Sequence, residues 1–398
     1  MTAIKPTTQQ PYAESLLRVP YTRIRELGEL AMTMDGVLRL YFGESNVPTP
    51  AYIVEAAVQA LRDGHTFYSE NAGLPSLRRG IAEQYRRLHG VELDAEREVV
   101  VTASGLLALH LAIRSAIDPG DEAIVLSPAW PNGAAIVTLC HGVPVEVPLA
   151  LAGERFEIDF DALESALTER TRLVLLTSPS NPLGWVARVD EQQRLLDLCR
   201  ERGLWLLADE VYERIYYGGA AAGEPAPSMT RLCDRHDRVH VVQSFSKSYC
   251  MTGWRVGWLV TRGDVGVKLA QLNEFFVSHA PTFAQVAALT ALTDGEEQLL
   301  GMVEGLRSNR DFCVEALRSM PGVTVPEPGG AFYVFPRIDG VDDSMAFCKR
   351  LLVEERVGLA PGSAFGAGGE GSVRICYAAE RGILEAALER LETFLASG

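Results

Sequence analysis

A lysine and an arginine lie eight residues apart in the stretch SFSKSYCMTGWRVGW, which runs from Ser244 to Trp258. Lys247 follows an apolar run, and burial of a lysine lowers the pKa of its amine because burial disfavours the charged form. A neutral amine is a nucleophile that condenses with an aldehyde to form a Schiff base. Arg255 carries a planar fork of donors that suits a phosphate. The stretch predicts a site for a phosphorylated aldehyde; the alternative is a surface lysine beside an ion-paired arginine.

Polar residues also end three other apolar runs. LWLLADEVY contains Asp209, which needs a cationic or hydrogen-bonding partner if it is buried and otherwise caps a helix, and Tyr212 follows three residues later. In LLTSPSNPLG, Asn181 either contacts a ligand or only initiates a turn. After EVVVTA, Ser104 and Gly105 begin an apolar helix, whose first amides and dipole favour an anion. A plain N-cap serine is the alternative there.

These residues together predict one ligand that carries a phosphate, an aldehyde, a ring nitrogen and a phenolic oxygen. Ser244 and Ser246 add hydroxyl donors beside Lys247. Pyridoxal 5′-phosphate (PLP) has all four groups. A carboxylate such as Asp209 near the pyridine nitrogen keeps that nitrogen protonated, which makes the ring an electron sink.

The elements that must position these residues alternate along the chain from about residue 98. Strands are expected at 98–103, 121–128, 143–149, 172–179, 204–210, 239–245 and 255–261. Helices are expected between several of them, at 105–117, 131–141, 160–168 and 189–202. Because the strands are apolar on both faces, this pattern predicts an α/β fold with a mainly parallel central sheet between two helical layers. Ligands of such sheets bind outside the carboxyl ends of the strands.

The two ends of the chain follow a different pattern. After about residue 283 a long helical stretch is expected to Met320, and further helices are expected at 343–356 and 380–396. The first 45 residues do not fit the rhythm of the sheet. We therefore expect a large domain at 46–285 and a smaller α+β domain built from 1–45 and 286–398.

Composition narrows the possible partners. The net charge of −15 argues against nucleic acid and against an anionic membrane surface. Seven cysteines without a C-x-x-C pair make a disulfide framework unexpected, and the histidines show no metal-binding spacing. The first residues, MTAIKPTTQQPY, lack the apolar core of a signal peptide, and no apolar run approaches the length of a membrane span. A cytoplasmic protein without a metal site is therefore expected.

The order of motifs from about residue 38 to 395 resembles the class I/II aminotransferase family, which are PLP-dependent enzymes of fold type I. The motifs that carry this resemblance are S-x-S-K followed by arginine, SPSNPLG, ADEVY, YSENAGLPSLRRGIA, GGAFYVFP and APGSAFG with VRICYA. The resemblance implies the fold-type I architecture, the cofactor PLP and transfer of an amino group.

The resemblance also implies roles for the cofactor residues. Lys247 would form the Schiff base and move the proton of the substrate, and Asp209 would pair with the ring nitrogen. Tyr212 and Asn181 would contact the phenolic oxygen, and Trp130 would stack on the ring. The phosphate would be held by Ser104, Gly105, Leu106, Ser244, Ser246 and Arg255.

Other residues would bind the substrate or the neighbouring subunit. Arg374 and Gly43 match residues that bind the substrate α-carboxylate, with Trp130 and Asn181 beside them. A bidentate arginine there would orient the Cα–H bond. Tyr68 matches a tyrosine that reaches the phosphate of the adjacent subunit, which implies a homodimer.

The expected reaction moves an amino group from an L-amino acid to a 2-oxo acid by a ping-pong mechanism. A PLP-dependent lyase or cyclase on the same scaffold is the alternative, because the cofactor motifs are shared. A regulatory protein with this fold has less support, because the chain is acidic. Ser45-Asn46 departs from the more common Pro-Asp, and Leu106 stands where some users of dicarboxylates carry a cation. Leu106 favours an aromatic or aliphatic substrate, although a neighbouring subunit could supply a charge.

Overall fold

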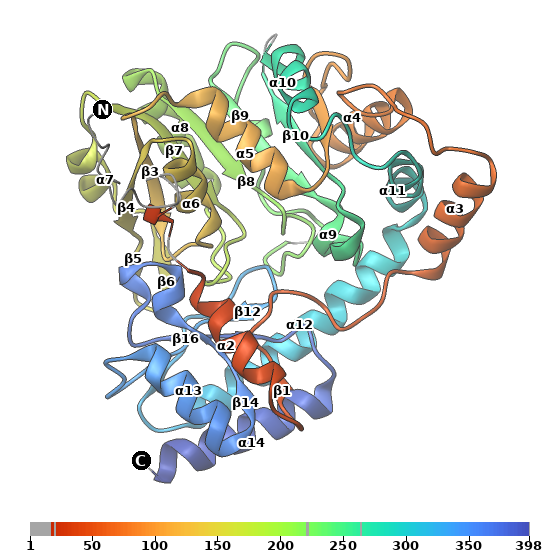
Figure 1. Cartoon of the computed structure of the whole chain (residues 1–398). Coiled ribbons are helices and arrows are strands. Elements are labelled where there is room, and N and C mark those ends of the chain that lie inside the picture. Colours follow the sequence, from red (N-terminus) through yellow and green to blue (C-terminus); the bar gives the residue numbers. More distant parts are fainter. Residues whose placement is uncertain (1–16, 20, 220–222, 263–264, 398) are drawn as a thin grey trace, which may run out of the picture.

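The structure is a computed structural model that describes residues 17–19, 21–219, 223–262 and 265–397. A seven-stranded sheet in the order β2-β10-β9-β8-β7-β3-β4 lies at its centre (Figure 1). The strands of this sheet are β2 (Val99–Thr102), β3 (Glu122–Ser127), β4 (Val143–Pro148), β7 (Thr171–Thr177), β8 (Trp205–Asp209), β9 (Val239–Ser244) and β10 (Gly257–Thr261). Each of the seven runs predicted as strands contributes one of them.

The sheet is mainly parallel, as the sequence predicted. Only β10 runs against its neighbours in this sheet, pairing antiparallel with both β2 and β9. A parallel connection needs a crossover of a dozen or more residues that returns the chain to the opposite edge. The segment between β9 and β10 instead forms the short helices α9 (Phe245–Ser248) and η2 (Thr252–Trp254) and re-enters the sheet beside Ser244.

Helices cover both faces of the sheet because alternate residues of a strand point to opposite faces. In β8, Leu207 packs among residues of α5 (Gly105–Ala116), α6 (Asn132–Leu139) and α10 (Val265–Glu274). Leu206 and Ala208 pack among residues of α4 (Pro75–His89), α7 (Phe160–Ala166) and α8 (Val189–Arg202). The predicted three-layer αβα arrangement is therefore confirmed, and the predicted helices differ from the observed ones by two residues at most.

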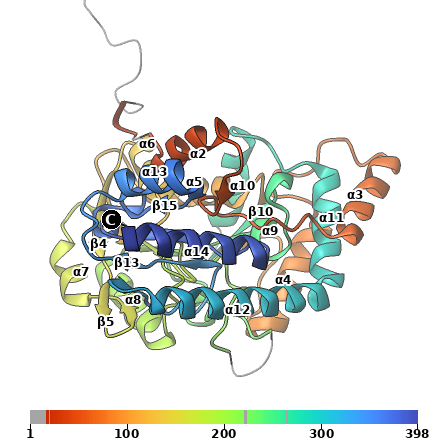
Figure 2. The same cartoon turned by 90° about the horizontal axis from the view of Figure 1, so that it is seen from below.

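A second group of elements lies below this sheet in Figure 1. Its strands are β1 (Leu38–Arg39), which pairs with β14 (Val357–Gly358), and the three-stranded sheet of β12 (Tyr333–Val334), β16 (Val373–Cys376) and β15 (Ala360–Pro361). Its helices are α2 (Arg23–Met32), α12 (Glu296–Ser319), α13 (Ser344–Glu355) and α14 (Arg381–Ser397). Figure 2 shows α12 and α14 side by side on this lower face, where they are in contact.

The pairing of β1 with β14 joins segments from the two ends of the described chain. Helix α2 likewise packs against α13. The division into domains at 46–285 and at 1–45 with 286–398 stays a prediction, and its residues 1–16 lie outside the described part.

The helical stretch expected from residue 283 to Met320 is two helices, so that prediction was wrong in one respect. Helix α11 (Thr282–Asp294) ends before Gly295, and α12 begins at Glu296. A Cβ atom on Gly295 would lie 2.4 Å from the carbonyl oxygen of Ala291 and 2.4 Å from the hydroxyl of Tyr52. The break therefore occurs where neighbouring groups leave no room for a side chain, which helical periodicity does not reveal.

The remaining elements connect these layers. They are α3 (Ala51–Arg62), the hairpin of β5 (Ala150–Ala152) and β6 (Arg155–Glu157), η1 (Met229–Arg231), the pair of β11 (Val323–Thr324) and β13 (Arg337–Ile338), η3 (Gly362–Phe365) and η4 (Ala367–Gly369). Among the described residues, no helix is both long and apolar enough to cross a membrane.

Candidate active site

A cavity of about 670 Å³ lies at the carboxyl edge of the sheet, between the sheet and the lower group of elements. Asp209 and Ser244 end the parallel strands β8 and β9 at this edge, and Gly257 of β10 pairs with Ser244 there. Of the residues predicted for the site, the cavity is lined by Gly43, Gly105, Leu106, Trp130, Asn181, Asp209, Tyr212, Ser244, Ser246, Lys247, Arg255 and Arg374. Folding thus brings twelve predicted residues from seven distant parts of the chain to one place.

Lys247 lies on α9, directly after β9, so that its amine enters the cavity from the sheet edge. Its Nζ donates a hydrogen bond of 2.6 Å to the carbonyl oxygen of Gly43. Burial, with a smaller contribution from the nearby guanidinium of Arg374, lowers the pKa of this amine to about 8. A substantial fraction of the amine is therefore neutral near pH 8, the form that attacks an aldehyde or removes a proton.

Asp209 ends β8 with its carboxyl group at the floor of the cavity. Its Oδ1 accepts a 3.3 Å hydrogen bond from the amide of Val211. Burial raises the pKa of Asp209 to about 6, whereas this amide and the charge of Lys247 oppose the rise. A buried carboxylate with so little compensation favours a cation at its free oxygen, and a protonated ring nitrogen is such a group.

Arg374 and Tyr212 form a hydrogen-bonded group at the side of the cavity. Arg374 is 1% exposed and donates to Asn181 Oδ1 at 2.8 Å and to the carbonyl oxygen of Tyr41 at 2.5 Å. The hydroxyl of Tyr212 lies 2.6 Å from that of Tyr333, and burial raises the pKa of Tyr212 well above its usual value. Burial also raises the pKa of Tyr333, so both tyrosines are neutral and can donate a hydrogen bond. The guanidinium of Arg374 is held in place by its two partners and can bind an anion.

The other end of the cavity gathers hydroxyl and guanidinium donors. Ser244 Oγ and Ser246 Oγ lie 2.9 Å apart. Arg255 has a positive φ of 57° and donates through Nη1 to the carbonyl oxygen of Thr252 at 2.6 Å. Arg255 was predicted as the first residue of a strand at 255–261, but the strand begins only at Gly257. Arg255 lies in the left-handed turn before β10, and its side chain lines the cavity.

Two glycines let the start of α5 approach the end of the sheet closely. A Cβ atom on Gly105 would lie 3.0 Å from the Cβ of Ser244, and one on Gly257 would lie 2.3 Å from the backbone nitrogen of Gly105. The first turn of α5 consequently faces the serines and Arg255, where helix amides and the helix dipole favour an anion.

Two predicted residues lie outside this cavity. Ser104 Oγ accepts a 3.2 Å hydrogen bond from the amide of Leu107, so its side chain caps α5, the alternative that the sequence left open. Tyr68 is 92% exposed, and its ring meets the edge of His279. The structure of one chain therefore does not bring Tyr68 to the site of that same chain.

The sequence analysis did not single out Tyr333, although GGAFYVFP contains it. A Cβ atom on Gly43 would lie 2.3 Å from the hydroxyl of Tyr333, so the tyrosine explains why a glycine stands at position 43. Arg25 of α2 also lines the cavity and stacks its guanidinium 5.5 Å from the ring centroid of Phe42. The sequence around Arg25 carried no motif that would have predicted its place in this cavity.

PLP fits these donors at each of its functional groups. The serines, Arg255 and the first turn of α5 suit the phosphate, Asp209 suits the ring nitrogen, Tyr212 and Asn181 suit the phenolic oxygen, and the amine of Lys247 suits the aldehyde. The three-layer αβα fold, with this site at the carboxyl edge of its sheet, has the architecture of the fold-type I class of PLP-dependent enzymes.

Comparisons with known proteins place the chain within that class. The sequence model described as "Aminotransferase class I and II" matches residues 36–391. An aspartate aminotransferase from Pyrococcus horikoshii is 34% identical over 386 residues, covering 96% of this chain and 97% of the relative. An aromatic-amino-acid aminotransferase from Thermococcus litoralis is 34% identical and covers 96% of this chain and 98% of the relative. A solved aspartate aminotransferase from Thermotoga maritima superposes with a TM-score of 0.89 at 34% identity, covering 97% of this chain and all of that one.

The chain belongs to the class I and II aminotransferase family, and it is a PLP-dependent aminotransferase. The resemblance read from the motif order is thereby confirmed. The comparisons give no support to the lyase alternative, since the relatives named here are aminotransferases.

Proposed function

We propose that Lys247 is the residue that carries the cofactor and moves the substrate proton, in a ping-pong exchange between an L-amino acid and a 2-oxo acid. The observation that carries this proposal is a buried amine with a lowered pKa in the same cavity as Asp209, Tyr212 and Arg374. When bound, PLP supplies a conjugated ring that accepts the electron pair left on the Cα of the substrate.

The side chains of the cavity would divide the remaining tasks. Arg374 binds the α-carboxylate, because its guanidinium is already fixed by Asn181 and by the carbonyl oxygen of Tyr41. Asp209 holds a positive charge at the ring nitrogen. Tyr212, supported by Tyr333, donates a hydrogen bond to the phenolic oxygen. Lys247 lines the same cavity as Arg374, so its amine would take the proton from the Cα of a substrate whose carboxylate Arg374 holds.

The substrate that the cavity favours has an aromatic or aliphatic side chain. Leu106 and Ile24 line the cavity, and both also line a second cavity of about 530 Å³ that adjoins it. The apolar side chains of this second cavity include Leu107, Ile136 and Phe276. A large apolar side chain can therefore extend there from the reacting carbon.

A dicarboxylic substrate is the second candidate. It is favoured by Arg25, a cation of the cavity wall in addition to Lys247, Arg255 and Arg374. Aspartate stands in the names of several relatives, whereas another is named for aromatic amino acids. Both classes of substrate therefore have a precedent among proteins of similar sequence.

A panel of amino acids mixed with the holoenzyme tests the proposal. Each amino acid that acts as a donor converts bound PLP into the pyridoxamine form, which is followed by absorbance. We expect conversion by phenylalanine, tyrosine or leucine to be faster than by aspartate or glutamate. The reverse order would establish the dicarboxylate candidate. Release of ammonia without a matching amount of aminated product would contradict transamination through this site.

The assembly that we propose is a homodimer in which Tyr68 reaches the site of the adjacent subunit. Its support is the exposure of neighbouring apolar residues, with Phe67 at 81%, Tyr68 at 92% and Phe275 at 84% exposed. Large exposed apolar groups of this kind mark interaction surfaces. A cytoplasmic location is proposed from the sequence alone, and cell fractionation tests it.

A further inference from the structure

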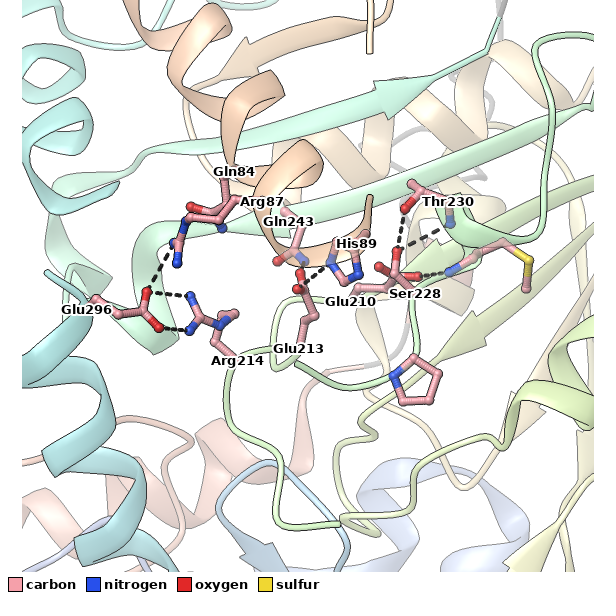
Figure 3. Close-up of polar contacts among 12 residues, drawn as sticks. Gln84, Arg87, His89, Glu210, Glu213, Arg214, Ser228, Thr230, Gln243 and Glu296 are labelled. Atoms are coloured by element: carbon pink, nitrogen blue, oxygen red, sulfur yellow. Dashed lines mark hydrogen bonds and ion pairs between the residues drawn. The ribbon is translucent and has the colours of Figure 1, made fainter. Parts of the chain in front are cut away.

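A buried polar cluster of His89, Glu213 and Gln243 lies at the turn that follows β8 (Figure 3). His89, the last residue of α4, places its Nε2 2.7 Å from Glu213 Oε1. Gln243 donates through Nε2 to the other carboxylate oxygen of Glu213. The side chains of His89 and Glu213 are 1% and 3% exposed. These contacts therefore form in an environment where water does not compete.

The cluster joins three segments of the chain, two of which carry residues of the active site. Glu213 directly follows Tyr212, and its amide donates at 2.8 Å to the carbonyl oxygen of Glu210, which closes a turn that begins after Asp209. Gln243 directly precedes Ser244 on β9. A Cβ atom on Gly105 would lie 3.2 Å from the carbonyl oxygen of Gln243. Movement of the Glu213–Gln243 contact would therefore shift both the turn and the end of β9.

The arginines near this cluster pair with carboxylates other than Glu213. Arg214 points to Glu296 at 2.5 Å, and Arg87 reaches the same carboxylate at 3.1 Å. Arg262 lies 3.3 Å from Glu98. Figure 3 shows the Arg214–Glu296 pair separate from the His89–Glu213 contact. The contact between His89 and Glu213 therefore holds the end of α4 against the turn that follows β8.

A second carboxyl group, Glu210, lies next to this pair. Its Oε1 accepts a 2.7 Å hydrogen bond from the amide of Met229. Burial, followed by the charge of Glu213, raises the pKa of Glu210 to about 8. Glu210 is therefore mostly neutral at pH 7, so that its carboxyl group adds little charge beside Glu213.

We propose that His89, Glu213 and Gln243 form a positioning network for catalysis, which holds the turn at 209–213 against the end of β9. None of the three lines the cavity, so each acts through Asp209, Tyr212 and Ser244. This inference rests on the proposed function of the site, because its effect is felt through the residues assigned there.

Substitution of His89 in the holoenzyme tests the network. His89→Leu removes the group that faces Glu213, whereas His89→Gln keeps a donor there. We expect kcat of His89→Leu to fall about tenfold or more, because small displacements of catalytic groups are costly, while KM changes less than about threefold. The midpoint of the pH titration of bound-cofactor absorbance should move to higher pH, because a displaced Tyr212 donates less firmly to the phenolic oxygen. His89→Gln should restore most of kcat and of the midpoint.

The control is Arg87→Gln. Arg87 lies on α4, as His89 does, and the change removes a partly exposed contact to Glu296 of α12. It should leave kcat and the midpoint unchanged. A His89→Leu enzyme with a lowered melting temperature but wild-type kcat and midpoint would overturn the inference, since the cluster would then serve stability alone. If His89→Leu does not fold, Glu213→Gln decides by the same two readouts, because it removes the charge and keeps the size.

Failure of the proposed function would look different. In that case the wild-type protein itself would fail to convert bound PLP with any amino acid of the panel, whatever the variants of His89 do. An active wild-type enzyme with unaffected variants would contradict only the network.

Discussion

Lys247 depends on its surroundings for its chemistry, because a lysine amine in water is almost fully protonated at neutral pH. Its Nζ is buried, contacts the carbonyl oxygen of Gly43, and shares the cavity with the cation of Arg374. Burial itself disfavours the charged form of this amine, which makes the neutral nucleophile available near pH 8. The reactivity of Lys247 thus comes from its position directly after β9, in the cavity between the sheet and the lower group of elements.

Replacement of Lys247 by alanine should remove nearly all transamination. We expect kcat to fall about 10³-fold or more, because both attachment of the cofactor and proton transfer are lost. Turnover with an amino acid and a 2-oxo acid measures this directly. Lys268→Ala is the matched control, since Lys268 lies exposed on α10 and only contacts Gln271. Turnover near the wild-type rate in Lys247→Ala would assign the role to another residue.

The lowered pKa of Lys247 predicts how the covalent binding of PLP depends on pH. Because the neutral amine is the nucleophile, the rate at which the apoenzyme binds PLP covalently should rise with pH and level off above about 8. An ordinary lysine would continue to gain reactivity up to its usual pKa of about 10.5. Stopped-flow absorbance across pH 6 to pH 10.5 records the curve, and a rise that continues past pH 10 would contradict a lowered pKa.

At the scale of elements, the site depends on the close contact between the start of α5 and the end of the sheet. Gly257→Ala would place a Cβ atom 2.3 Å from the backbone nitrogen of Gly105, and backbone atoms cannot move aside as a side chain can. We expect a loss of about 1–3 kcal/mol in the free energy of unfolding and weaker retention of PLP. Chemical denaturation and dialysis of the holoenzyme measure these two effects.

Gly301→Ala provides the comparison for that variant, because Gly301 lies on α12 with open space around it. Alanine favours a helix over glycine, so this change should raise stability by about 0.5–1 kcal/mol. Equal behaviour of the two variants would mean that the contact between α5 and β10 has no special importance.

The turn after β8 makes the stability of the protein depend on pH through Glu210. Its raised pKa means that the folded state holds a proton between about pH 4.5 and pH 8 that the unfolded state has lost. This group therefore contributes a stability that is complete below pH 4.5 and is lost as pH rises through 8.

Glu210→Gln should remove this dependence, because glutamine does not ionise and its oxygen can still accept from Met229. Relative to the wild type, the variant should gain about 1 kcal/mol or more in the free energy of unfolding between pH 5 and pH 8, since one pKa unit corresponds to about 1.4 kcal/mol. Urea denaturation at both pH values checks this. Glu83→Gln is the control, because Arg86 lowers the pKa of that exposed carboxylate and no gain with rising pH is expected.

At the scale of the whole molecule, the proposed role of Tyr68 requires a second chain, because its side chain is 92% exposed and lies outside the cavity of its own chain. The proposed homodimer predicts that activity per chain falls on dilution into the range where dimers dissociate. Tyr68→Phe, which removes only the hydroxyl, should weaken retention of PLP, because a donor to the phosphate is lost from the adjacent site. Phe275→Asp should shift the protein toward monomers by placing a charge on the exposed apolar surface.

Analytical ultracentrifugation together with activity at each concentration tests this assembly. Val353→Asp is the matched control, because Val353 is also exposed (52%) but lies on α13, in the lower group of elements. A fully active monomer of the wild-type chain would refute shared sites. A Phe275→Asp variant that stays a dimer would place the interface elsewhere.

The sequence by itself determined the sheet and half of the residues that line the cavity. Runs of apolar residues gave the seven strands because a strand buried on both faces has no polar side, and this property is local. Lys247, Asp209 and Asn181 were found because polar residues at the ends of such runs are unusual. Family resemblance then supplied Arg374 and Gly43, whose local sequences would not have distinguished them from a salt bridge and a turn.

The tertiary structure decided what depends on segments far apart in the chain. Tyr333 meets Tyr212 across 121 positions, and His89 meets Glu213 across 124, so no local period could pair them. At Gly295, likewise, a side chain would meet the hydroxyl of Tyr52, which lies far away in the sequence. Local sequence fixes which groups face inward along a strand or helix, whereas packing fixes which of those groups touch.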